Sequence, residues 1–435
     1  MRGEGNHTPT LVPTTGEAIE KGEPIMMKHV TGARCLRCGS VWPDKPNLTT
    51  CPDCGGLLDI EYDYDAIRWE VNRDTFKGRR ERSMWRYLEY LPVEGIGRRP
   101  RLRVGWSPFY EAEGLARKLG LGRLCIKDDG VNPTASLKDR ASAMAVVKAE
   151  EAGAEVIACS STGNAASSLA GNAAAAGFPT YIFVPSRAPK GKVSQLMIFG
   201  AHVISVDSTY EDTFRLSEQA IKRYGWYNRN AAINPFLMEG KKTVALEIAE
   251  QLHWEMTDFV ALSVGDGCTI AGVWKGFRDL YATGMIDRLP RLLSVQAEGC
   301  CPLNRAIAEN RPWEPMEENT LADSIAVGVP RNADKALRAI RESHGVVVNV
   351  SDQEILDAAK LLGRSCGVFG EPAGVAGTAG VKKAVESGLI PAGASVVSIV
   401  TGNGLKDTPN AIRAAGEPVC IGPTMDELLA VMDRV

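Results

Sequence analysis

A lysine stands where the sequence predicts the start of a helix. Lys138 follows the polar segment 131–137 and opens an alanine-rich stretch of helical character. The positive end of a helix dipole disfavours a second cation by about 0.3–1 kcal/mol, so a lysine at this place is unusual. Asp139 and Arg140 beside it suit helix capping and ion pairing. Taken alone, Lys138 is most simply a solvated loop lysine. Three further segments of the sequence favour a reactive lysine instead.

A second segment carries hydroxyl groups and free backbone N–H groups. Residues 160–164 (SSTGN) follow a predicted strand that ends at Cys159 and lead into the helix-forming stretch 165–176. Turns of this kind between a strand and a helix bind carboxylates or phosphates. Ser, Thr and Asn also cap ordinary helices, so capping is an equally good interpretation on local grounds.

A third segment, 265–269 (GDGCT), lies between an apolar strand and another helix, where backbone amides bind phosphate. A Walker A loop has a lysine after its last glycine, but Val273 follows Gly272. A dinucleotide-binding loop has a glycine where Ile270 stands. These differences argue against an ATPase and against an NAD enzyme. A fourth segment begins with the hydroxyl of Thr401, at the end of the last apolar strand.

The four segments together predict one chemistry. A reactive lysine, a phosphate-binding glycine loop and an anion-binding Ser/Thr/Asn loop are what pyridoxal 5′-phosphate (PLP) requires. The sequence resembles the fold-type II PLP enzymes, and within them the threonine synthases. The resemblance covers about residues 106–409. The matching motifs are PTASLKDR (133–140), STGN (161–164), NP (234–235), EGKK (239–242), GF (276–277), QAEG (296–299), EPA (371–373) and TGNGLKD (401–407).

The resemblance implies a role for each residue. Lys138 would carry the cofactor and move protons, Asn164 would hydrogen-bond the ring oxygen of the cofactor, and Thr401 would face its pyridine nitrogen. A neutral hydroxyl there makes the ring a weaker electron sink, which suits elimination better than transamination. Ser161, Thr162 and Gly163 would hold the substrate carboxylate. The cofactor phosphate would be held by Gly265, Asp266, Gly267, Cys268 and Thr269.

A threonine synthase converts O-phosphohomoserine and water into threonine and phosphate. Lys138 would remove the α-proton of the substrate, and general acid–base help of this kind is typically worth about 10²–10⁴-fold in rate. Burial beside cations would lower the pKa of the lysine towards this task. Two alternatives stay open. One is PLP-dependent elimination or β-replacement on another hydroxy-, phospho- or thio-amino acid, and the other is a ligand-binding protein without turnover, against which the presence of Lys138 argues.

The chain departs from threonine synthases where they hold the substrate phosphate. They usually carry an Asn-Ser pair before the Asn-Pro, an arginine after it, and a threonine after STGN. Each lost charge-assisted hydrogen bond is worth about 1.5–3 kcal/mol, so other groups must replace them. The residues at these places are Ala231, Ala232, Leu237 and Ala165.

Nearby polar residues are available as replacements, although we expect each to be a solvated surface residue. They are Arg229, Asn230, Lys190 and Lys192. Two smaller departures lie in the cofactor segments. The usual Gly-Ser-Phe-Lys is Ala135-Ser136-Leu137-Lys138, and Asp266 replaces an asparagine in the phosphate loop. An acid beside a phosphate is unexpected, so Asp266 either points away from it or contacts another group on the substrate.

Two CxxC pairs predict a metal site near the N-terminus. Cys35 and Cys38 are separated by twelve residues from Cys51 and Cys54, and each pair places two thiolates on one turn. Four such thiolates close a tetrahedron around Zn²⁺ and leave no open position, so the zinc would be structural. Four free cysteines and a nucleic-acid-binding ribbon are the alternatives. The flanking residues lack the basic and aromatic run that nucleic-acid binding would need.

The elements that must position these loops alternate between strands and helices. Short β-branched runs separated by alanine-rich stretches predict βαβ units, with parallel sheets buried on both faces. Ligands bind beyond the carboxyl ends of such strands, where the four segments lie. The expected strands are 124–127, 155–159, 180–184, 202–206, 259–264, 292–295 and 396–400.

We therefore expect an α/β protein with two parallel-sheet, three-layer subdomains and a small N-terminal module resembling a zinc ribbon. Trp69, Trp85, Tyr87 and Tyr90 suggest a helical connector that docks on the main body. The expected organisation is an N-terminal arm (1–28), the zinc-ribbon-like module (29–60), the connector (61–100), the catalytic body (101–410, with the smaller subdomain around 135–230) and a C-terminal tail (411–435).

Composition and charge narrow the class of partner. With 44% hydrophobic and 24% charged residues, the chain of 435 residues has ample core material and is not a disordered protein. The formal charge of −3 gives no global reason to expect nucleic acid or a membrane, so a small amino-acid substrate is favoured. No long apolar run or signal peptide is evident, and we expect a cytoplasmic protein with reduced cysteines. Enzymes of the resembling family are commonly dimers, so a homodimer is expected.

Overall fold

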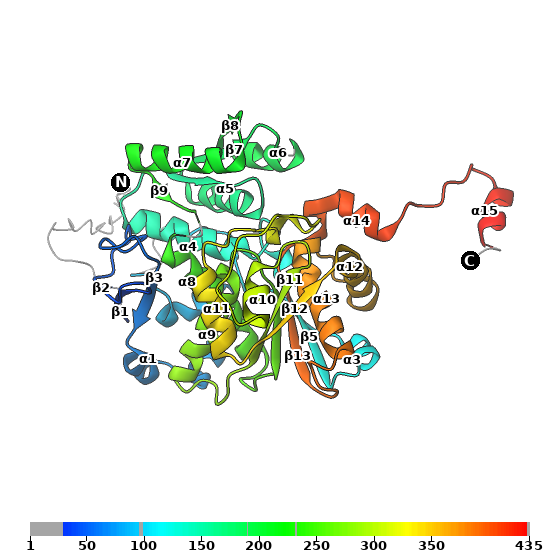
Figure 1. The fold of residues 1–435 in the computed structure, drawn as a ribbon, viewed down its shortest axis with the longest axis horizontal. Coiled ribbons are helices and arrows are strands. Elements are labelled where there is room, and N and C mark those ends of the chain that lie inside the picture. Colours follow the sequence, from blue (N-terminus) through cyan, green and yellow to red (C-terminus); the bar gives the residue numbers. More distant parts are fainter. Residues whose placement is uncertain (1–28, 95–98, 189, 231–232, 433–435) are drawn as a thin grey trace, which may run out of the picture.

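The computed structural model describes residues 29–94, 99–188, 190–230 and 233–432, and the expected N-terminal arm lies outside them. The described residues form three sheets with helices packed around them (Figure 1). The expected α/β class is confirmed. All seven expected strands are present, and their ends differ from the predicted ones by up to two residues.

The largest sheet has the strand order β12-β11-β10-β13-β5-β4. Its neighbours pair in parallel except β4, which is antiparallel to β5 at one edge. Two of these strands were missing from the sequence prediction, namely β4 and β12. The strands are β4 (Phe109–Glu111), β5 (Arg123–Asp128), β10 (Phe259–Ser263), β11 (Arg291–Ala297), β12 (Val346–Val350) and β13 (Ser395–Val400).

Both faces of this sheet are buried, which explains its nearly continuous apolar strands. Along β10, Val260 and Leu262 pack into one core with helices α8–α11, while Phe259 and Ala261 pack into another core with α3, α12 and α13. The helices of the first face are α8 (Pro235–Gln251), α9 (Cys268–Ala282), α10 (Pro302–Ala308) and α11 (Ala333–Glu342). Those of the second are α3 (Glu113–Leu119), α12 (Asp352–Cys366) and α13 (Pro372–Glu386).

The smaller sheet has four parallel strands in the order β8-β7-β6-β9. It contains β6 (Ile157–Ser160), β7 (Thr180–Pro185), β8 (His202–Val206) and β9 (Tyr227–Asn228). The helices that connect or precede these strands are α4 (Lys138–Glu151), α5 (Asn164–Ala176), α6 (Lys190–Ile198) and α7 (Tyr210–Tyr224). Short 3₁₀ turns are η2 (Asp129–Val131), η3 (Asp323–Ile325) and η4 (Gly404–Asp407).

The N-terminal part contains a small antiparallel sheet and short helices. The sheet pairs β1 (Val30–Cys35) with β2 (Val41–Trp42) and β3 (Leu58–Tyr62). Helices α1 (Tyr64–Glu70), α2 (Arg73–Lys77) and the 3₁₀ helix η1 (Met84–Tyr90) follow. Trp85, Tyr87 and Tyr90 are buried as expected, but Trp69 is 91% exposed, contrary to the prediction. In the short helix α1 the inward residue is Ile67, and a residue two positions later points to the opposite side.

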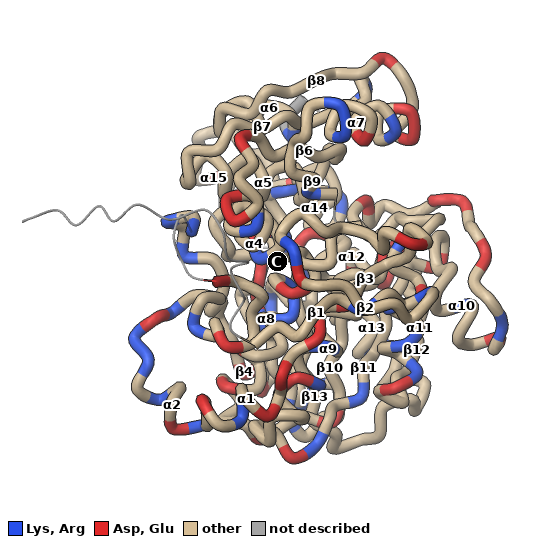
Figure 2. Tube along the Cα trace, turned by 90° about the vertical axis from the view of Figure 1, so that its left-hand side faces the viewer, with Lys and Arg blue, Asp and Glu red and all other residues tan. Residues whose placement is uncertain are grey.

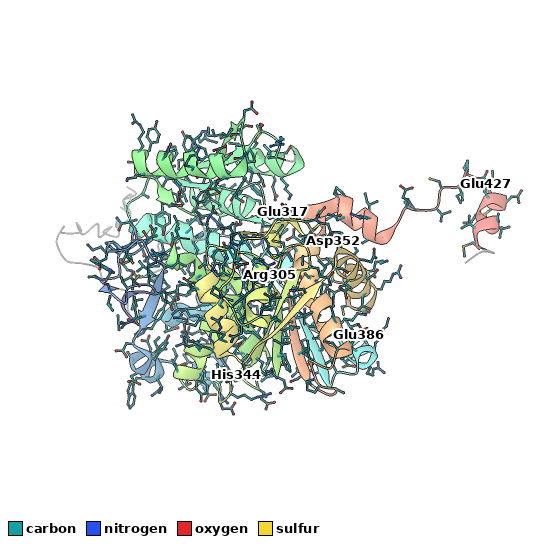
Figure 3. The ribbon with its side chains drawn as sticks, in the orientation of Figure 1. Arg305, Glu317, His344, Asp352, Glu386 and Glu427 are labelled. Atoms are coloured by element: carbon teal, nitrogen blue, oxygen red, sulfur yellow. The ribbon has the colours of Figure 1, made fainter. Side chains whose placement is uncertain are left out.

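The C-terminal tail carries α14 (Thr408–Ala415) and α15 (Met425–Met432), and α15 lies clear of the body (Figure 1). Glu427 on α15 is well apart from labelled body residues such as Asp352 (Figure 3). Acidic and basic residues are interspersed along the chain trace (Figure 2). Among the described helices, none combines the length and the hydropathy that crossing a membrane would need.

Candidate active site

Lys138 is the first residue of α4, as the sequence predicted. The loop before it is held at both ends. The Asp139 carboxylate accepts hydrogen bonds from the N–H and the hydroxyl of Thr134, both at 2.9 Å, and the Leu137 N–H donates to the Thr401 carbonyl at 2.9 Å. Ala135 adopts φ +68°, a left-handed conformation that favours glycine. These contacts join the loops that follow β5 and β13 and position the lysine.

The Lys138 amine lies at a half-buried place and has no ion-pair partner among the described residues. Its side chain is half-buried, and no hydrogen bond or ion pair holds Nζ among the described residues. Burial, together with the nearby cations Lys241 and Arg229, lowers the pKa of Lys138 to about 8, while Cys268 and Glu371 act in the opposite direction. A lysine with such a pKa is partly neutral near physiological pH and can act as a nucleophile or a proton carrier. The simpler interpretation as a solvated loop lysine is therefore wrong.

Asn164 and Glu371 form a buried pair. The Asn164 Nδ2 group, at the start of α5, donates to Glu371 Oε1 at 2.6 Å. Burial raises the pKa of Glu371 to about 7, although the Asn164 hydrogen bond and the Lys138 charge favour the carboxylate. The sequence motif EPA contained Glu371, but sequence reasoning gave it no role. The only local signal was an acid directly before a helix of small residues, and its partner lies 207 positions away in the chain.

The segment after β6 leaves the start of α5 open. Ser161, Thr162 and Gly163 are half-buried, and the Gly163 N–H donates to the Ser161 hydroxyl at 3.2 Å. No side chain caps α5, so the interpretation of this segment as an ordinary helix cap is wrong. The Ala166 and Ser167 N–H groups donate to the Gly163 carbonyl, and the Asn164 and Ala165 N–H groups before them are suited to bind a carboxylate.

The predicted phosphate loop leads directly into α9, which also lacks a side-chain cap. Gly267 has φ +89°, and a Cβ there would come within 2.7 Å of the Ala336 Cβ on α11, so only glycine fits. The Asp266 carboxylate accepts hydrogen bonds from the Arg331 N–H at 2.8 Å and from Asn332 Nδ2 at 3.2 Å. This acid is thus turned towards the start of α11. Cys268 is buried and Thr269 half-buried in the first turn of α9.

Two buried cations lie close to Lys138. Arg229 is 1% exposed and donates to the hydroxyls of Ser142, at 3.0 and 3.1 Å, and Ser168, at 3.5 Å. These serines lie one helical turn after Lys138 and Asn164 respectively. Lys241 is 2% exposed, and among the described residues neither cation has an ion-pair partner. Buried charge without a counter-charge is costly, so these cations predict a bound anion.

The predicted substitutes for the substrate-phosphate contacts divide into two groups. Arg229 and Asn230 are buried, so the expectation that they lie on the surface is wrong. Lys192 forms an ion pair with Asp323 at 2.5 Å. Leu237 is fully buried in the core, and Ala165 is half-buried. Ala231, Ala232 and the Lys190 side chain lie outside the described residues.

The four N-terminal cysteines are brought together as predicted. The Sγ atoms of Cys35, Cys38, Cys51 and Cys54 lie within 4.8 Å of one another. Zn–S bonds of about 2.3 Å require sulfur atoms somewhat less than 4 Å apart, so the cluster fits a tetrahedral site. Gly39 and Gly55, which follow each pair, have φ +76° and +68° and close the two turns.

Comparison with known proteins agrees with this geometry. Residues 101–402 match the family model described as "Pyridoxal-phosphate dependent enzyme". This chain belongs to that family. Its relatives include the threonine synthase of Methanocaldococcus jannaschii, which is 41% identical over 92% of this chain and 99% of that protein. The threonine synthase of Methanosarcina acetivorans is 39% identical over 91% of this chain and 97% of that protein.

A solved structure confirms the fold of this pyridoxal-phosphate dependent enzyme. The processed form of threonine deaminase isoform 2 from Solanum lycopersicum superposes with a TM-score of 0.61. It is 21% identical in sequence and covers 72% of this chain and 88% of its own. At this identity the likeness concerns the fold alone.

The site fits the cofactor of a pyridoxal-phosphate dependent enzyme. The uncapped start of α9 behind Gly267 offers backbone N–H groups to a phosphate. The unpaired amine of Lys138 is available for the aldehyde. The buried charges of Arg229 and Lys241 need an anion beside them. Among the described residues, none of the three cations Lys138, Arg229 and Lys241 has an ion-pair partner, which is the strongest sign that an anionic ligand belongs there.

Proposed function

We propose that the protein is a threonine synthase that converts O-phosphohomoserine and water into threonine and phosphate. The observation that carries this proposal is the Lys138 amine at the start of α4, which has no ion-pair partner among the described residues and lies close to the buried cations Arg229 and Lys241. Threonine synthases at 41% and 39% identity over more than nine tenths of this chain support it. The enzyme is a lyase of the carbon–oxygen type, with a place in amino-acid biosynthesis.

The proposed cofactor contacts follow the sequence prediction. Lys138 holds PLP, Asn164 binds its ring oxygen, Thr401 faces its pyridine nitrogen, and residues 265–269 bind its phosphate. When bound, PLP supplies an electron sink for negative charge at the α-carbon of the substrate. The carboxylate of Asp266 points to α11, so the contribution of this residue to phosphate binding is through its backbone.

The protein side chains supply substrate orientation and proton transfer. Ser161, Thr162 and Gly163 bind the substrate carboxylate at the open start of α5. The Lys138 amine, with its pKa lowered to about 8, takes the α-proton and returns protons to the substrate carbons. Glu371, with its pKa raised to about 7, carries a proton beside Asn164 and keeps that amide oriented.

Arg229 and Lys241 are the proposed binding groups for the substrate phosphate. They replace polar contacts that are lost where Ala165 and Leu237 stand, and the cationic character that a phosphate needs is retained. The same replacement favours a second candidate function. With a rebuilt anion site, the enzyme could carry out elimination or β-replacement on another hydroxy-, phospho- or thio-amino acid.

A substrate assay tests the proposed function. Purified holoenzyme is incubated with O-phosphohomoserine, and phosphate and threonine are measured. We expect both products in equal amounts, and neither from Lys138→Ala, which also loses the visible absorbance of the lysine-bound cofactor. Lys382→Ala, at a lysine that is 45% exposed, is the matched control and keeps full activity. Absence of phosphate release from O-phosphohomoserine, with turnover of a serine or cysteine derivative, would replace the proposal with the second candidate.

We further propose that Cys35, Cys38, Cys51 and Cys54 bind a structural zinc ion in a zinc-ribbon-like module. The clustering of the four thiols supports this site. None of the eleven cysteines, all of which lie in described residues, forms a disulfide, which supports the proposed cytoplasmic location, because reducing compartments keep cysteines reduced. A homodimer is proposed from the exposed apolar residues of α15, which include Met425, Leu429 and Met432.

A further inference from the structure

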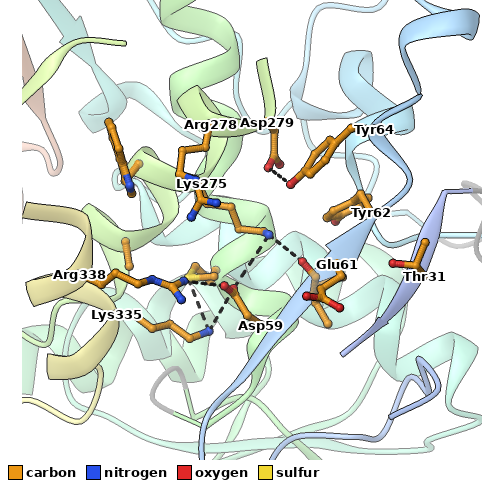
Figure 4. Close-up of a pocket in the computed structure, with 14 residues that line it drawn as sticks. Thr31, Asp59, Glu61, Tyr62, Tyr64, Lys275, Arg278, Asp279, Lys335 and Arg338 are labelled. Carbon is orange, nitrogen blue, oxygen red and sulfur yellow. Dashed lines mark hydrogen bonds and ion pairs between the residues drawn. The ribbon is translucent and has the colours of Figure 1, made fainter. Parts of the chain in front are cut away.

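A cavity of about 300 Å³ lies between the N-terminal module and helices α9 and α11 (Figure 4). None of the residues assigned above to the cofactor, the substrate or zinc lines it. Strand β3 forms one wall, and aromatic side chains from Tyr62, Tyr64 and Trp274 contribute to the lining. Its volume is at the lower end of the range that is usual for small-molecule binding sites.

Four basic side chains converge on this cavity from two helices. Lys275 and Arg278 are three residues apart on α9, and Lys335 and Arg338 are three residues apart on α11. This spacing places each pair on one helix face. Figure 4 shows Lys275, Lys335 and Arg338 approaching Asp59 on β3.

The Asp59 carboxylate is the ion-pair partner of three of these cations. Asp59 lies 2.7 Å from Arg338, 3.6 Å from Lys335 and 4.0 Å from Lys275. Burial by itself would raise the pKa of Asp59, but these three cations hold it well below its usual range. The Asp59 Oδ1 atom is buried and accepts no hydrogen bond among the described residues. Oδ1 is also the Asp59 oxygen nearest Lys335 and Lys275, so the cavity lies beside a carboxylate whose hydrogen-bonding capacity is not filled and beside clustered positive charge.

The other acids at the cavity are already paired with cations outside its lining. Glu61 pairs with Arg34 at 2.5 Å, and Asp279 pairs with Lys242 at 2.7 Å. Two acids outside the lining complete the network. Glu239 lies 2.5 Å from Lys242 and 3.8 Å from Lys275, and Glu342 lies 3.3 Å from Arg278 and 3.9 Å from Arg338.

The network as a whole has one positive charge in excess, because six cations face five acids. The cations are Arg34, Lys242, Lys275, Arg278, Lys335 and Arg338, and the acids are Asp59, Glu61, Glu239, Asp279 and Glu342. Arg278 and Arg338 are 49% and 40% exposed, so a ligand can reach them from solvent. The excess charge suits a small molecule with one negative charge, and Asp59 suits a donor group on that molecule.

We propose that this cavity binds a small organic carboxylate that also carries a hydroxyl or amino group. The carboxylate is held by Arg278, Lys335 and Arg338, and the donor group faces the Asp59 carboxylate, whose side chain is 17% exposed. The site lies directly behind the predicted phosphate loop, since α9 begins at that loop and the residues before α11 bind Asp266. A ligand here bridges the two helices that position the loop.

The test is a calorimetric titration of the full-length holoenzyme with L-lactate, and with acetate as the carboxylate without a donor. We expect wild type to bind L-lactate more tightly than acetate. Arg338→Gln and Arg278→Gln should each weaken L-lactate binding by about tenfold or more, the order expected for one charge-assisted hydrogen bond. Arg341→Gln is the matched control, because Arg341 is exposed on the same helix α11 and does not line the cavity.

Arg278→Gln guards against a folding defect in Arg338→Gln, because Arg278 pairs only with Glu342 among the described residues and not with Asp59. Lactate that binds at the active site would still bind to both variants. The difference in lactate binding between wild type and the variants therefore reports the cavity alone. Undiminished lactate binding by both variants, or no binding to wild type at tens of millimolar lactate, would overturn the proposal. The titration needs no turnover, so its result is independent of the threonine synthase assay.

Discussion

At the scale of single residues, burial determines the chemistry of the site. Lys138 and Glu371 have ordinary pKa values on opposite sides of neutrality, and burial moves both towards it, to about 8 and about 7. Both groups thereby become able to exchange protons at physiological pH, which general acid–base catalysis requires. The Asn164 amide, bound to Glu371, links this proton-carrying pair to the start of α5.

The raised pKa of Glu371 predicts a pH dependence of stability in the cofactor-free protein. The folded state keeps the proton up to about pH 7, whereas the unfolded chain releases it near the ordinary value of 4.5. The free energy of unfolding that depends on this proton is therefore fully present below about pH 4.5 and is lost as the pH rises through 7. The loss is of the order of 3 kcal/mol.

Glu371→Gln should remove this dependence, because the neutral amide still accepts the Asn164 hydrogen bond and does not titrate. Denaturant unfolding at pH 5 and pH 8 measures it: the variant should gain stability relative to wild type at the higher pH. Glu386→Gln, at a side chain that is 58% exposed, is the control and should follow wild type. Equal pH profiles for wild type and Glu371→Gln would show that Glu371 titrates normally.

At the scale of elements, the site depends on helices that begin without side-chain caps. Helices α4, α5 and α9 start at Lys138, Asn164 and Cys268, and no side chain caps any of them. Part of the N–H groups at these helix starts is thus left for ligands, although in α4 the Asp139 and Arg140 N–H groups donate to the Ser136 and Leu137 carbonyls. The loops before the three helices are shaped by contacts with other elements. The phosphate loop, for example, packs against α11 so closely that Gly267 has no room for a side chain.

Gly267→Ala should therefore weaken cofactor binding. Gly284, at the other end of α9, is the matched control, since it has φ +73° but no atom within 4 Å of an added Cβ. Both alanines carry the backbone strain of the left-handed conformation, about 1–2 kcal/mol, but only the one at residue 267 displaces the loop. Titration with PLP, followed by visible absorbance, should show a raised dissociation constant for Gly267→Ala alone. If the two variants bound PLP with similar affinity, the loop at Gly267 would not be part of the cofactor site.

Removal of zinc should loosen the N-terminal module from the body. The cysteine cluster holds β1 and the turn at 51–54, and β3 pairs with β1. The outer edge of β3 is bound to the body, because Lys335 donates to the Leu58 carbonyl at 2.5 Å and Lys275 to the Ile60 carbonyl at 2.7 Å.

We expect a chelator, or Cys38→Ser, to remove the metal and to lower the thermal midpoint by several degrees, because structural zinc contributes directly to folding. Added zinc should restore the chelated wild type. Cys420→Ser is the control, since Cys420 is exposed and outside the cluster. The metal content and the thermal midpoint are measured together. A wild type without metal but with an unchanged midpoint would argue against a structural zinc site.

At the scale of the whole molecule, the C-terminal helix α15 is a part of the described chain that does not pack on the body (Figure 1). Helix α15 has no buried residue, and Leu428, Leu429 and Met432 are exposed on it. An apolar groove of about 220 Å³ lies beside α14, lined by residues that include Leu356 and Phe369. Lys360 and Arg364 also line the groove, and Asp426 and Glu427 on α15 complement their charge. Within one chain α15 lies clear of the body, so we expect it to occupy the groove of a second copy (Figure 1).

Deletion of residues 417–435 should then convert a dimer into a monomer, as measured by light scattering. Leu429→Asp in the full-length chain should have the same effect by placing a charge in the apolar contact. Ser387→Asp is the control, because Ser387 is exposed and does not line the groove. This variant should leave the molar mass in solution unchanged. A dimer that survives both changes would place the interface elsewhere. A monomeric wild type would exclude the dimer.

The sequence by itself determined the local features. Hydrophobic runs predicted the positions of seven strands, a change of pattern predicted the start of α4 at Lys138, and the spacing of four cysteines predicted their cluster. Each of these follows from residues close together in the chain, where the periods of strand and helix and the geometry of a single turn apply.

Only the tertiary structure decided what each group faces. It buried Arg229 instead of exposing it, paired Asn164 with Glu371, and turned Asp266 towards α11. It also left Trp69 in solvent. Burial, pKa and partner choice are set by atoms from distant parts of the chain, and no local pattern records which helix will cover a given side chain.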